Sequence, residues 1–314
     1  MLCCRQELFD SAQISRFLNF QMTQMRPVQI IAAASGAGAR DPGCAKGPDA
    51  VRHSGLLSRL NLHGLDISWR KTLRPPPTGA PLSIIHELNE HLAQQVCDSA
   101  MSGNLPLVIG GDHSCAIGTW SGAARALKHY GRLGLIWIDA HMDSHTPETT
   151  PSGAIHGMPL AALLGCGVPE LVNLAGFSPK LLPRHVCLVG VRSYEPGEAD
   201  LLQRLGVRVF FMAEVKQRGI GNVMKEAFAI ARHATAGFGI SIDLDAFNPR
   251  ESPGVGTPVQ DGLRHLELDR VLRGIGKLPD LVALELAEFN PLRDHDNRTL
   301  ELIEDLLSAI SQDD

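Results

Sequence analysis

Leu133-Gly-Leu-Ile-Trp-Ile138, followed by Asp139-Ala-His141-Met-Asp143, sets the class of fold that this chain can adopt. A short apolar run of this kind predicts a strand buried on both faces, as in a parallel sheet. The acidic residues and the histidine follow at once, so they stand at the carboxyl end of that strand. In open α/β sheets, ligands bind in the crevice outside these strand ends.

Three other apolar runs end in the same way. Gly110-Gly-Asp-His113 follows Leu105–Ile109, Asp243-Leu-Asp245 follows Gly237–Ile242, and Ala287-Glu288 follows Leu281–Leu286. Further β-rich runs occupy Val28–Ala33, Leu65–Trp69, His185–Val191 and Val207–Met212. Together they predict a mainly parallel sheet of about eight strands.

Helical stretches lie between most of these runs. In the clearest, Ser83–Met101, apolar residues recur on one face at a spacing of about 3.6 residues. Other helices are predicted at Pro48–Leu60, Ser114–His129, Gly197–Leu205, Asn222–His233, Arg264–Ile275 and Asn297–Ile310. Strands alternating with helices predict an α/β fold with helices on both faces of the sheet, a three-layer αβα arrangement.

The domain organisation is simple. No linker or change in composition divides the chain, and the proline-rich stretch Arg74–Pro81 is too short to separate domains. We therefore expect an N-terminal extension over residues 1–27 and a single domain over residues 28–314. Within the extension, Ser11–Phe20 is compatible with a short amphipathic helix capped by Asp10, and a disordered tail is the alternative.

Composition excludes several classes of function. The 314 residues carry 29 Lys and Arg against 34 Asp and Glu, a formal charge of −5, so nucleic acid is not an expected partner. Apolar stretches such as Leu160–Leu164 fall far short of the ~20 residues of a membrane helix. Seven scattered cysteines with no CxxC pair indicate free thiols in a reducing compartment, and hence a cytoplasmic protein.

The acidic strand ends indicate a metal centre. Residues two apart in an extended chain share a face, so Asp139, His141 and Asp143 can point one way, as can Asp243 and Asp245. Carboxylates converging in one crevice repel one another, and divalent cations relieve that repulsion. Two cations ~3.5–4 Å apart can also activate a bridging water as hydroxide near neutral pH. The predicted ligands are His113, Asp139, His141, Asp143, Asp243 and Asp245.

Oxygen-rich ligands with two imidazoles and no thiolate favour Mn²⁺, with Fe²⁺, Co²⁺ or Ni²⁺ as alternatives and Zn²⁺ less favoured. A lone DxHxD segment is more often a solvated turn. Two such clusters and a GGDH segment, each directly after a β-run, favour the metal site instead. The remaining histidines are interpreted as surface or packing residues: His53, His63, His86, His91, His129, His185, His233, His265 and His295.

The same segments resemble the ureohydrolase superfamily of arginases, agmatinases and their relatives. The matching motifs run from about Gly36 to Pro291 in the family's order: Gly110–Ser114, Asp139–Asp143, Ser152–Pro159, Ser241–Asp245, Gly254–Pro258 and Glu288–Pro291. The stretch Thr149–Gly165 looks most like bacterial arginases. The resemblance implies an arginase-like fold and two Mn²⁺ per chain.

The resemblance also implies roles for individual residues. One metal would take His113, Asp139, Asp143 and Asp243, and the other would take His141 and Asp245 and share Asp139 and Asp243. His156 matches the family's proton-shuttling histidine, and Glu288 matches the carboxylate that binds the guanidinium group. Asp143 would also accept a hydrogen bond from the hydroxide. The implied reaction releases urea and an amine, ornithine if the substrate is arginine.

The substrate-binding loop departs from the family pattern. Ser152 is retained, but His145 and Ala154 stand where asparagines are usual, and Glu195 occupies the acidic position that receives an α-amino group. Thr257, in the Gly254–Pro258 motif, is also expected to contact substrate. L-arginine is the favoured substrate. Agmatine, guanidinobutyrate or another guanidino or formimino compound is the alternative.

Two further hypotheses stay open at this stage. A metal-binding pseudo-enzyme would explain the altered loop at His145 and Ala154. A deacetylase-type amidohydrolase would share the sheet but keep a single zinc. The resemblance further implies a homo-oligomer, a trimer or a hexamer.

Overall fold

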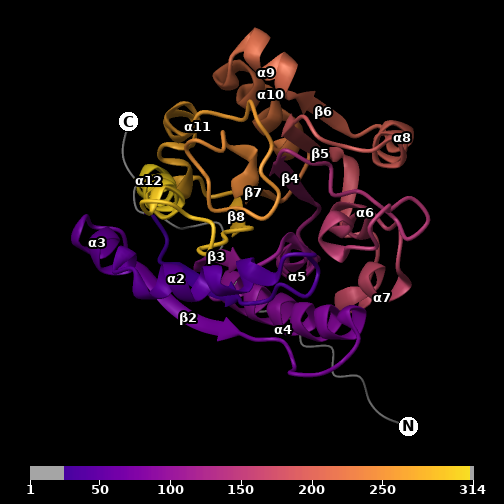
Figure 1. The fold of residues 1–314 in the computed structure, drawn as a ribbon, viewed down its shortest axis with the longest axis horizontal. Helices are drawn as coiled ribbons and strands as arrows, with labels where there is room; N and C mark the ends of the chain where they lie inside the picture. Colours follow the sequence, from indigo (N-terminus) through magenta and orange to yellow (C-terminus); the bar gives the residue numbers. More distant parts are fainter. Residues whose placement is uncertain (1–24, 312–314) are drawn as a thin grey trace.

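The computed structural model describes residues 25–311, which build one eight-stranded sheet in the order β2-β1-β3-β8-β7-β4-β5-β6 (Figure 1). All seven strand pairs are parallel. The strands are β1 (Val28–Ala33), β2 (Ile67–Leu73), β3 (Leu105–Gly110), β4 (Leu133–Ile138), β5 (Leu181–Val191), β6 (Arg208–Phe211), β7 (Gly237–Asp243) and β8 (Leu281–Ala287). The predicted parallel sheet is confirmed.

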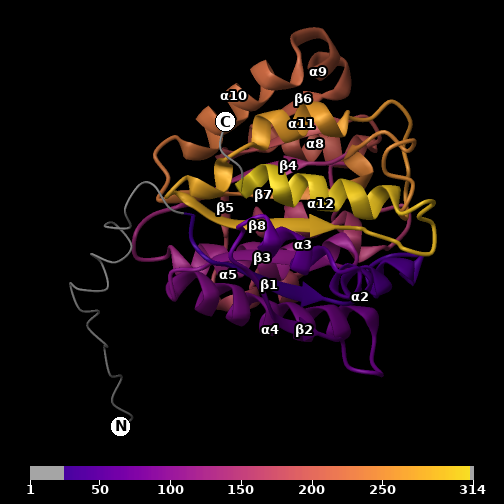
Figure 2. The ribbon, with the colours of Figure 1, turned by 90° about the vertical axis from the view of Figure 1, so that its left-hand side faces the viewer.

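Helices cover both faces of the sheet. They are α2 (Gly47–His53), α3 (Leu56–Leu62), α4 (Pro81–Met101), α5 (Ala116–Ala126), α6 (Pro159–Leu163), α7 (Pro169–Val172), α8 (Pro196–Leu205), α9 (Met212–Arg218), α10 (Ile220–Arg232), α11 (His265–Leu272) and α12 (Arg298–Ser311). Figure 1 shows α11 and α12 on one side of the sheet and α5 and α6 on the other, and Figure 2 shows α12 lying across the near face. The predicted three-layer arrangement is confirmed.

The two largest hydrophobic clusters of the described residues lie on opposite faces of the sheet. Strands β3, β4, β7 and β8 are buried at every position, so side chains of either parity must find apolar partners. In β1, Ile30 belongs to the cluster that includes residues of α10, α11 and α12, and Ile31 to the cluster that includes residues of α4, α5 and α6. Alternation along the strands therefore connects both helical layers to one sheet.

Several predicted boundaries differ from the structure. The helix predicted over Pro48–Leu60 is two helices, because Gly55, with φ 79°, turns the chain between α2 and α3. The strand predicted at Leu65–Trp69 begins at Ile67 and continues to Leu73, and β5 begins at Leu181 rather than His185. Met212, predicted to end a strand, begins helix α9.

Short helices α6 and α7 were not predicted, since each is too brief to show periodicity. The helix predicted at Ser11–Phe20 lies outside the described residues. Among residues 25–311, no helix combines the length and the apolar character needed to cross a membrane.

Candidate metal centre

The predicted site residues follow four neighbouring strands. His113 lies in a 3-10 turn after β3, Asp139 follows β4, Asp243 ends β7 and Glu288 follows β8. The sheet order places these strands side by side as β3-β8-β7-β4 in the middle of the sheet. Because the strands are parallel, their carboxyl ends open onto the same edge.

His113 faces three carboxylates at once. Its Nδ1 atom lies 3.3 Å from Asp139 Oδ2, 3.0 Å from Asp143 Oδ2 and 3.1 Å from Asp243 Oδ2. Even so, this buried nitrogen has no partner with hydrogen-bond geometry among the described residues. Ligand atoms ~2.1 Å from a metal at the corners of an octahedron are ~3 Å apart. The spacing therefore suits atoms arranged around a common cation better than a hydrogen-bonded network.

A second cluster shares Asp139 with the first. His141 Nδ1 lies 3.5 Å from Asp139 Oδ1 and 3.1 Å from Asp245 Oδ2. The two groups His113–Asp139–Asp143 and Asp139–His141–Asp245 can each hold a metal ion. Asp243 contacts His113 through Oδ2, while its Oδ1 accepts a hydrogen bond from the backbone nitrogen of Asp245 at 2.8 Å.

The electrostatics of these side chains favour a bound cation. Burial raises the pKa of Asp143 to about 6, and the charge of Asp139 adds to this rise. Burial also raises the pKa of Asp243 well above its usual value, with further increases from Asp245 and Asp139. Burial alone would raise the pKa of Asp139 too, but its close contacts with His113 and His141 and their charges lower it. Positive charge is thus what keeps a carboxylate ionised here.

A buried network behind His113 fixes its ring. Ser241 Oγ lies 3.0 Å from His113 Nε2 and donates to Glu285 Oε2 at 2.6 Å. Glu285 also accepts from Thr119 Oγ1 at 2.6 Å and from Trp120 Nε1 at 3.0 Å. With Nε2 engaged in this way, Nδ1 is the atom available to a metal.

Sequence reasoning missed Ser241 and Glu285 as supporting residues. The one available signal was a charged residue within the apolar run Leu281–Leu286. A glutamate that is fully buried in a central strand needs hydrogen-bond partners, which only the neighbouring elements can supply.

The backbone is strained at two candidate site residues. Asp143 has φ 47° and Glu288 has φ 68°, so both adopt the left-handed region that costs a non-glycine residue about 1–3 kcal/mol. Close packing also shapes the segment before His113, because a Cβ atom on Gly111 would lie 1.9 Å from the carbonyl oxygen of Ser35. The surrounding structure must hold these residues in place.

His156 and Glu288, assigned separately from the sequence, are in direct contact. His156 Nδ1 lies 2.9 Å from Glu288 Oε1, which also accepts a hydrogen bond from the backbone nitrogen of His113 at 2.9 Å. Burial would lower the pKa of His156, but the hydrogen bond with Glu288 and the charges of Glu288, Asp143 and Asp112 together outweigh this and raise the pKa to about 9. In return, His156 holds the pKa of buried Glu288 below its usual value.

The altered loop residue His145 lies between two glutamates. Its Nε2 atom is 2.9 Å from Glu195 Oε2 and 3.3 Å from Glu198 Oε2, and its Nδ1 is 3.1 Å from Thr149 Oγ1. Glu195 caps α8 in a capping box with Glu198, which positions both carboxylates. Glu198 was not predicted as part of the site, although a capping box can be recognised from its spacing.

Ser152 and Thr257 were also predicted to contact substrate. Ser152 is exposed, and its hydroxyl accepts a hydrogen bond from the backbone nitrogen of Ala154 at 3.1 Å. Thr257 Oγ1 donates to Asp245 Oδ2 at 2.9 Å, so it orients a candidate metal ligand. Neither contact tests the predicted binding of substrate.

Comparisons with known proteins agree with this arrangement. The Arginase family model matches residues 26–311. Arginase from Bacillus caldovelox is 40% identical over 299 residues, 91% of this chain and 98% of the relative. The crystal structure of arginase from Bacillus subtilis has a TM-score of 0.86 at 36% identity, covering 92% of this chain and 99% of that one. Entamoeba histolytica arginase in complex with L-ornithine has a TM-score of 0.84 at 29% identity, covering 92% and 99%.

The αβα sheet and the paired His/Asp clusters define a ureohydrolase, a hydrolase with a binuclear metal centre. Matches to bacterial arginases extend over nine-tenths of the chain. The chain belongs to the Arginase family, as its sequence motifs predicted.

Proposed function

We propose that this protein hydrolyses L-arginine to L-ornithine and urea with two Mn²⁺ per chain. The observation that carries the proposal is the Asp139 carboxylate, whose two oxygens face His113 and His141 in the two adjoining clusters. The proposal is supported by the relatives named arginase and by the related structure that is described in complex with L-ornithine.

The donor set fits two Mn²⁺ ions. His113, Asp139, Asp143 and Asp243 would hold one ion, and His141 and Asp245 would hold the other with Asp139 and Asp243 shared. The buried, unpartnered Nδ1 of His113 suits this ligand role. Carboxylates with imidazole and no thiolate also accept Fe²⁺, Co²⁺ or Ni²⁺. When bound, two such metal ions would lower the pKa of a coordinated water and so supply a nucleophile near neutral pH.

Glu288 would bind and orient the guanidinium group. Its pKa is lowered, so its carboxylate is ionised at neutral pH and can pair with a planar cation through parallel hydrogen bonds. Its Oε1 atom already accepts hydrogen bonds from His156 and from the backbone of His113, which fixes the position of the carboxylate. A held guanidinium group presents its carbon in one orientation, which favours attack.

His156 would transfer a proton to the leaving amine. With a pKa raised to about 9, its imidazole is protonated near pH 7 and can act as a general acid. It is part-buried and touches Glu288, so the proton donor lies next to the proposed guanidinium site. Asp143 would accept a hydrogen bond from the attacking water.

The amino-acid end of the substrate would lie near His145, Ser152, Glu195 and Thr257. Glu195 is half exposed, and hydrogen bonds from Glu198 and His145 lower its pKa, so it can receive an ammonium group. His145 already occupies one oxygen of Glu195, and Ala154 offers no side-chain amide. These two features favour, as a second candidate, a guanidino substrate that lacks one of the polar groups of L-arginine, such as agmatine or guanidinobutyrate.

A substrate panel with metal analysis on the same sample tests the proposal. Full-chain protein loaded with Mn²⁺ should contain two metal ions and release urea from L-arginine. Turnover of agmatine, guanidinobutyrate or a formimino compound instead of L-arginine would reassign the substrate. Two bound metals without turnover of any guanidino compound would indicate a pseudo-enzyme, and one zinc per chain would indicate a deacetylase-type site.

We also propose that residues 28–314 form a single catalytic domain in a cytoplasmic homo-oligomer, a trimer or a hexamer, with neither nucleic acid nor membrane as a partner. The free thiols of Cys44, Cys97, Cys115, Cys166 and Cys187 support a reducing compartment. Light scattering of the purified chain measures the number of subunits directly.

A further inference from the structure

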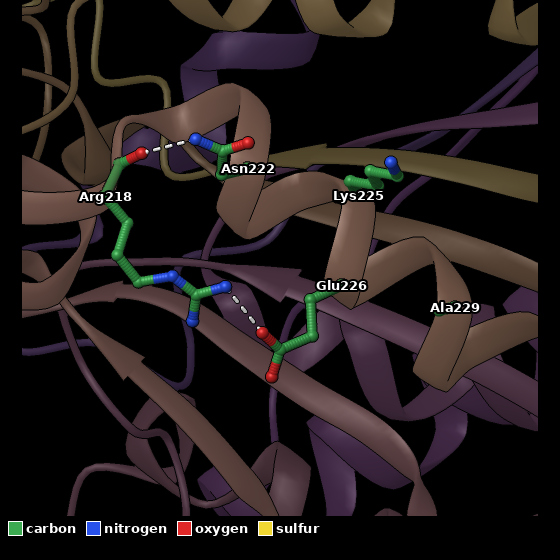
Figure 3. Close-up of a pocket in the computed structure, with 5 residues that line it drawn as sticks. All are labelled: Arg218, Asn222, Lys225, Glu226 and Ala229. Carbon is green, nitrogen blue, oxygen red and sulfur yellow. Dashed lines mark hydrogen bonds and ion pairs between the residues drawn. The ribbon is translucent and has the colours of Figure 1, made fainter.

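Charged side chains of the described residues also gather away from the candidate metal centre. The surface hollow in Figure 3, about 540 Å³ in volume, lies along α10 between Arg218 and Ala229. There Arg218 donates to Glu226 at 2.6 Å and to Glu214 at 2.6 Å, so both charges of this ion pair along the hollow are already satisfied. A cluster between α11 and α12 differs in this respect.

Three potential ligands meet where α11 packs beside α12. His265 and Asp269 are four residues apart on α11, which places them on one face of the helix. Asp305 approaches from α12, with its Oδ2 atom 3.6 Å from His265 Nε2. One nitrogen or oxygen atom from each residue lies within 4.8 Å of the other two.

Asp269 is the unusual member of this cluster. The residue is only 6% exposed, and its Oδ1 atom has no hydrogen-bond partner among the described residues. Burial raises the pKa of this carboxyl to about 6, an effect that His265 and Arg273 oppose and that Asp305 and Glu251 reinforce. A buried carboxylate oxygen without a partner is costly, so it indicates a ligand that completes the site.

Glu251 orients the histidine for such a ligand. Its Oε2 atom accepts a hydrogen bond from the backbone nitrogen of His265 at 2.9 Å and lies 3.4 Å from the ring Nδ1. Arg264 holds the other oxygen of Glu251 at 2.6 Å. A histidine that donates through Nδ1 to a carboxylate presents Nε2 as a metal ligand, an arrangement common around zinc. Here Nε2 faces Asp305.

We propose that His265, Asp269 and Asp305 form an additional divalent-metal site, distinct from the candidate binuclear centre, that joins α11 to α12. One imidazole and two carboxylates suit Zn²⁺, with water in the remaining position. The side chain of Asp305 is 55% exposed, which gives the ion a path from solvent. The bound ion would fasten two helices that pack on the same face of the sheet.

Counting metals tests this site. Full-chain protein loaded with Mn²⁺ is incubated with a small excess of Zn²⁺, desalted, and analysed for total metal per chain. The unmodified protein should hold one more ion than either His265→Ala or Asp305→Asn. The matched control His53→Ala removes an exposed histidine at the end of α2 and should lose none. Zn²⁺ should also raise Tm in the unmodified protein and in the control, but not in the two variants.

The difference in metal ions per chain between the unmodified protein and the two variants does not depend on the proposed binuclear centre. If that centre failed to bind metal, the unmodified protein would still exceed the variants by one ion. Neither variant alters a proposed catalytic residue, so unchanged turnover after Mn²⁺ loading confirms that the variant is folded. Two variants are used so that the test still stands if one of them does not fold. Equal metal counts in the unmodified protein and in every folded variant would overturn the proposal.

Discussion

Asp139 faces His113 through Oδ2, at 3.3 Å, and His141 through Oδ1, at 3.5 Å. A single carboxylate thus belongs to both His/Asp clusters. Trp137 Nε1 donates to Oδ2 at 2.9 Å, and the backbone nitrogen of His141 donates to Oδ1 at 2.7 Å, so both oxygens are held in place. The shared position makes this residue the most sensitive point of the proposed centre.

Replacing Asp139 by Asn should remove at least one Mn²⁺ per chain and lower kcat/KM by ~10²-fold or more. Replacing a residue that only hydrogen-bonds to a metal ligand typically costs about 10–100-fold, and a direct ligand should cost at least as much. The amide cannot offer two anionic oxygens to two cations. Metal analysis and urea release check both effects. The control Asp200→Asn alters an exposed aspartate of α8 and should behave as the unmodified protein. Full activity of the Asp139 variant would refute the shared site.

Replacing Ser241 by Ala should weaken Mn²⁺ binding by about 10–100-fold while the fold persists, because the hydroxyl that links His113 to Glu285 is lost. The measurement is a competition titration of Mn²⁺ against a chelator. Ser121→Ala provides a matched control, since this buried hydroxyl has no partner among the described residues. An Mn²⁺ affinity equal to that of the control would show that the network does not support the metal.

Replacing Glu288 by Gln should leave both metals bound but lower kcat/KM by about 10–100-fold, since a charge-assisted hydrogen bond is worth roughly 1.5–3 kcal/mol. The variant should also lower the pKa of His156, because the hydrogen bond with Glu288 raises it. Metal analysis checks that both ions stay bound, and steady-state kinetics measures the loss of kcat/KM. Unchanged kinetics would remove Glu288 from guanidinium binding.

Replacing Glu195 by Gln should raise KM by about 10-fold or more for L-arginine and agmatine, which carry an amino group, and leave KM for 4-guanidinobutyrate unchanged. The comparison among substrates distinguishes ammonium binding from a general disturbance of the loop. Glu148→Gln, a change at an exposed glutamate between His145 and Ser152, is the control. A uniform rise for all three substrates would contradict the assigned contact.

Lys180 should make stability depend on pH. Burial lowers its pKa to about 8, against about 10.4 in the unfolded chain, although the charge of Glu90 opposes the shift. Its ammonium lies 5.3 Å from the ring centre of Phe177. Between these values the unfolded state binds more protons, so this residue makes the free energy of unfolding rise with pH from about 8 to 10. The residue is only 2% exposed, so below pH 8 its buried charge lowers the free energy of unfolding by at most about 3 kcal/mol.

Lys180→Met should therefore be more stable than the unmodified protein at pH 7 and lose that advantage by pH 10, as measured by urea unfolding across this range. Lys128 lies 5.5 Å from the same ring centre but is exposed, so Lys128→Met should show no such pH-dependent difference. A constant difference between Lys180→Met and the unmodified protein at every pH would contradict the assignment.

The chain's own residues, read in order, predict much of the candidate centre. Asp139, His141 and Asp143 follow β4 directly, and Asp243 and Asp245 lie at the end of β7, so local spacing alone brings each set to one strand end. Parallel strands then bring the two sets to a common edge. The break between α2 and α3 was not predicted, and the predicted ends of β2 were wrong, because local patterns do not reveal where packing ends an element.

Linear sequence was sufficient for the identity of the strands and of the candidate metal ligands, because alternation and strand-end chemistry are local properties. Only the tertiary structure decided that Ser241 pairs in register with Glu285 behind His113, that His156 touches Glu288, and that Asp305 reaches His265. These contacts join residues far apart in the chain. Their physical origin is the order and register of the strands and the packing of helices on them, which depend on the whole core at once.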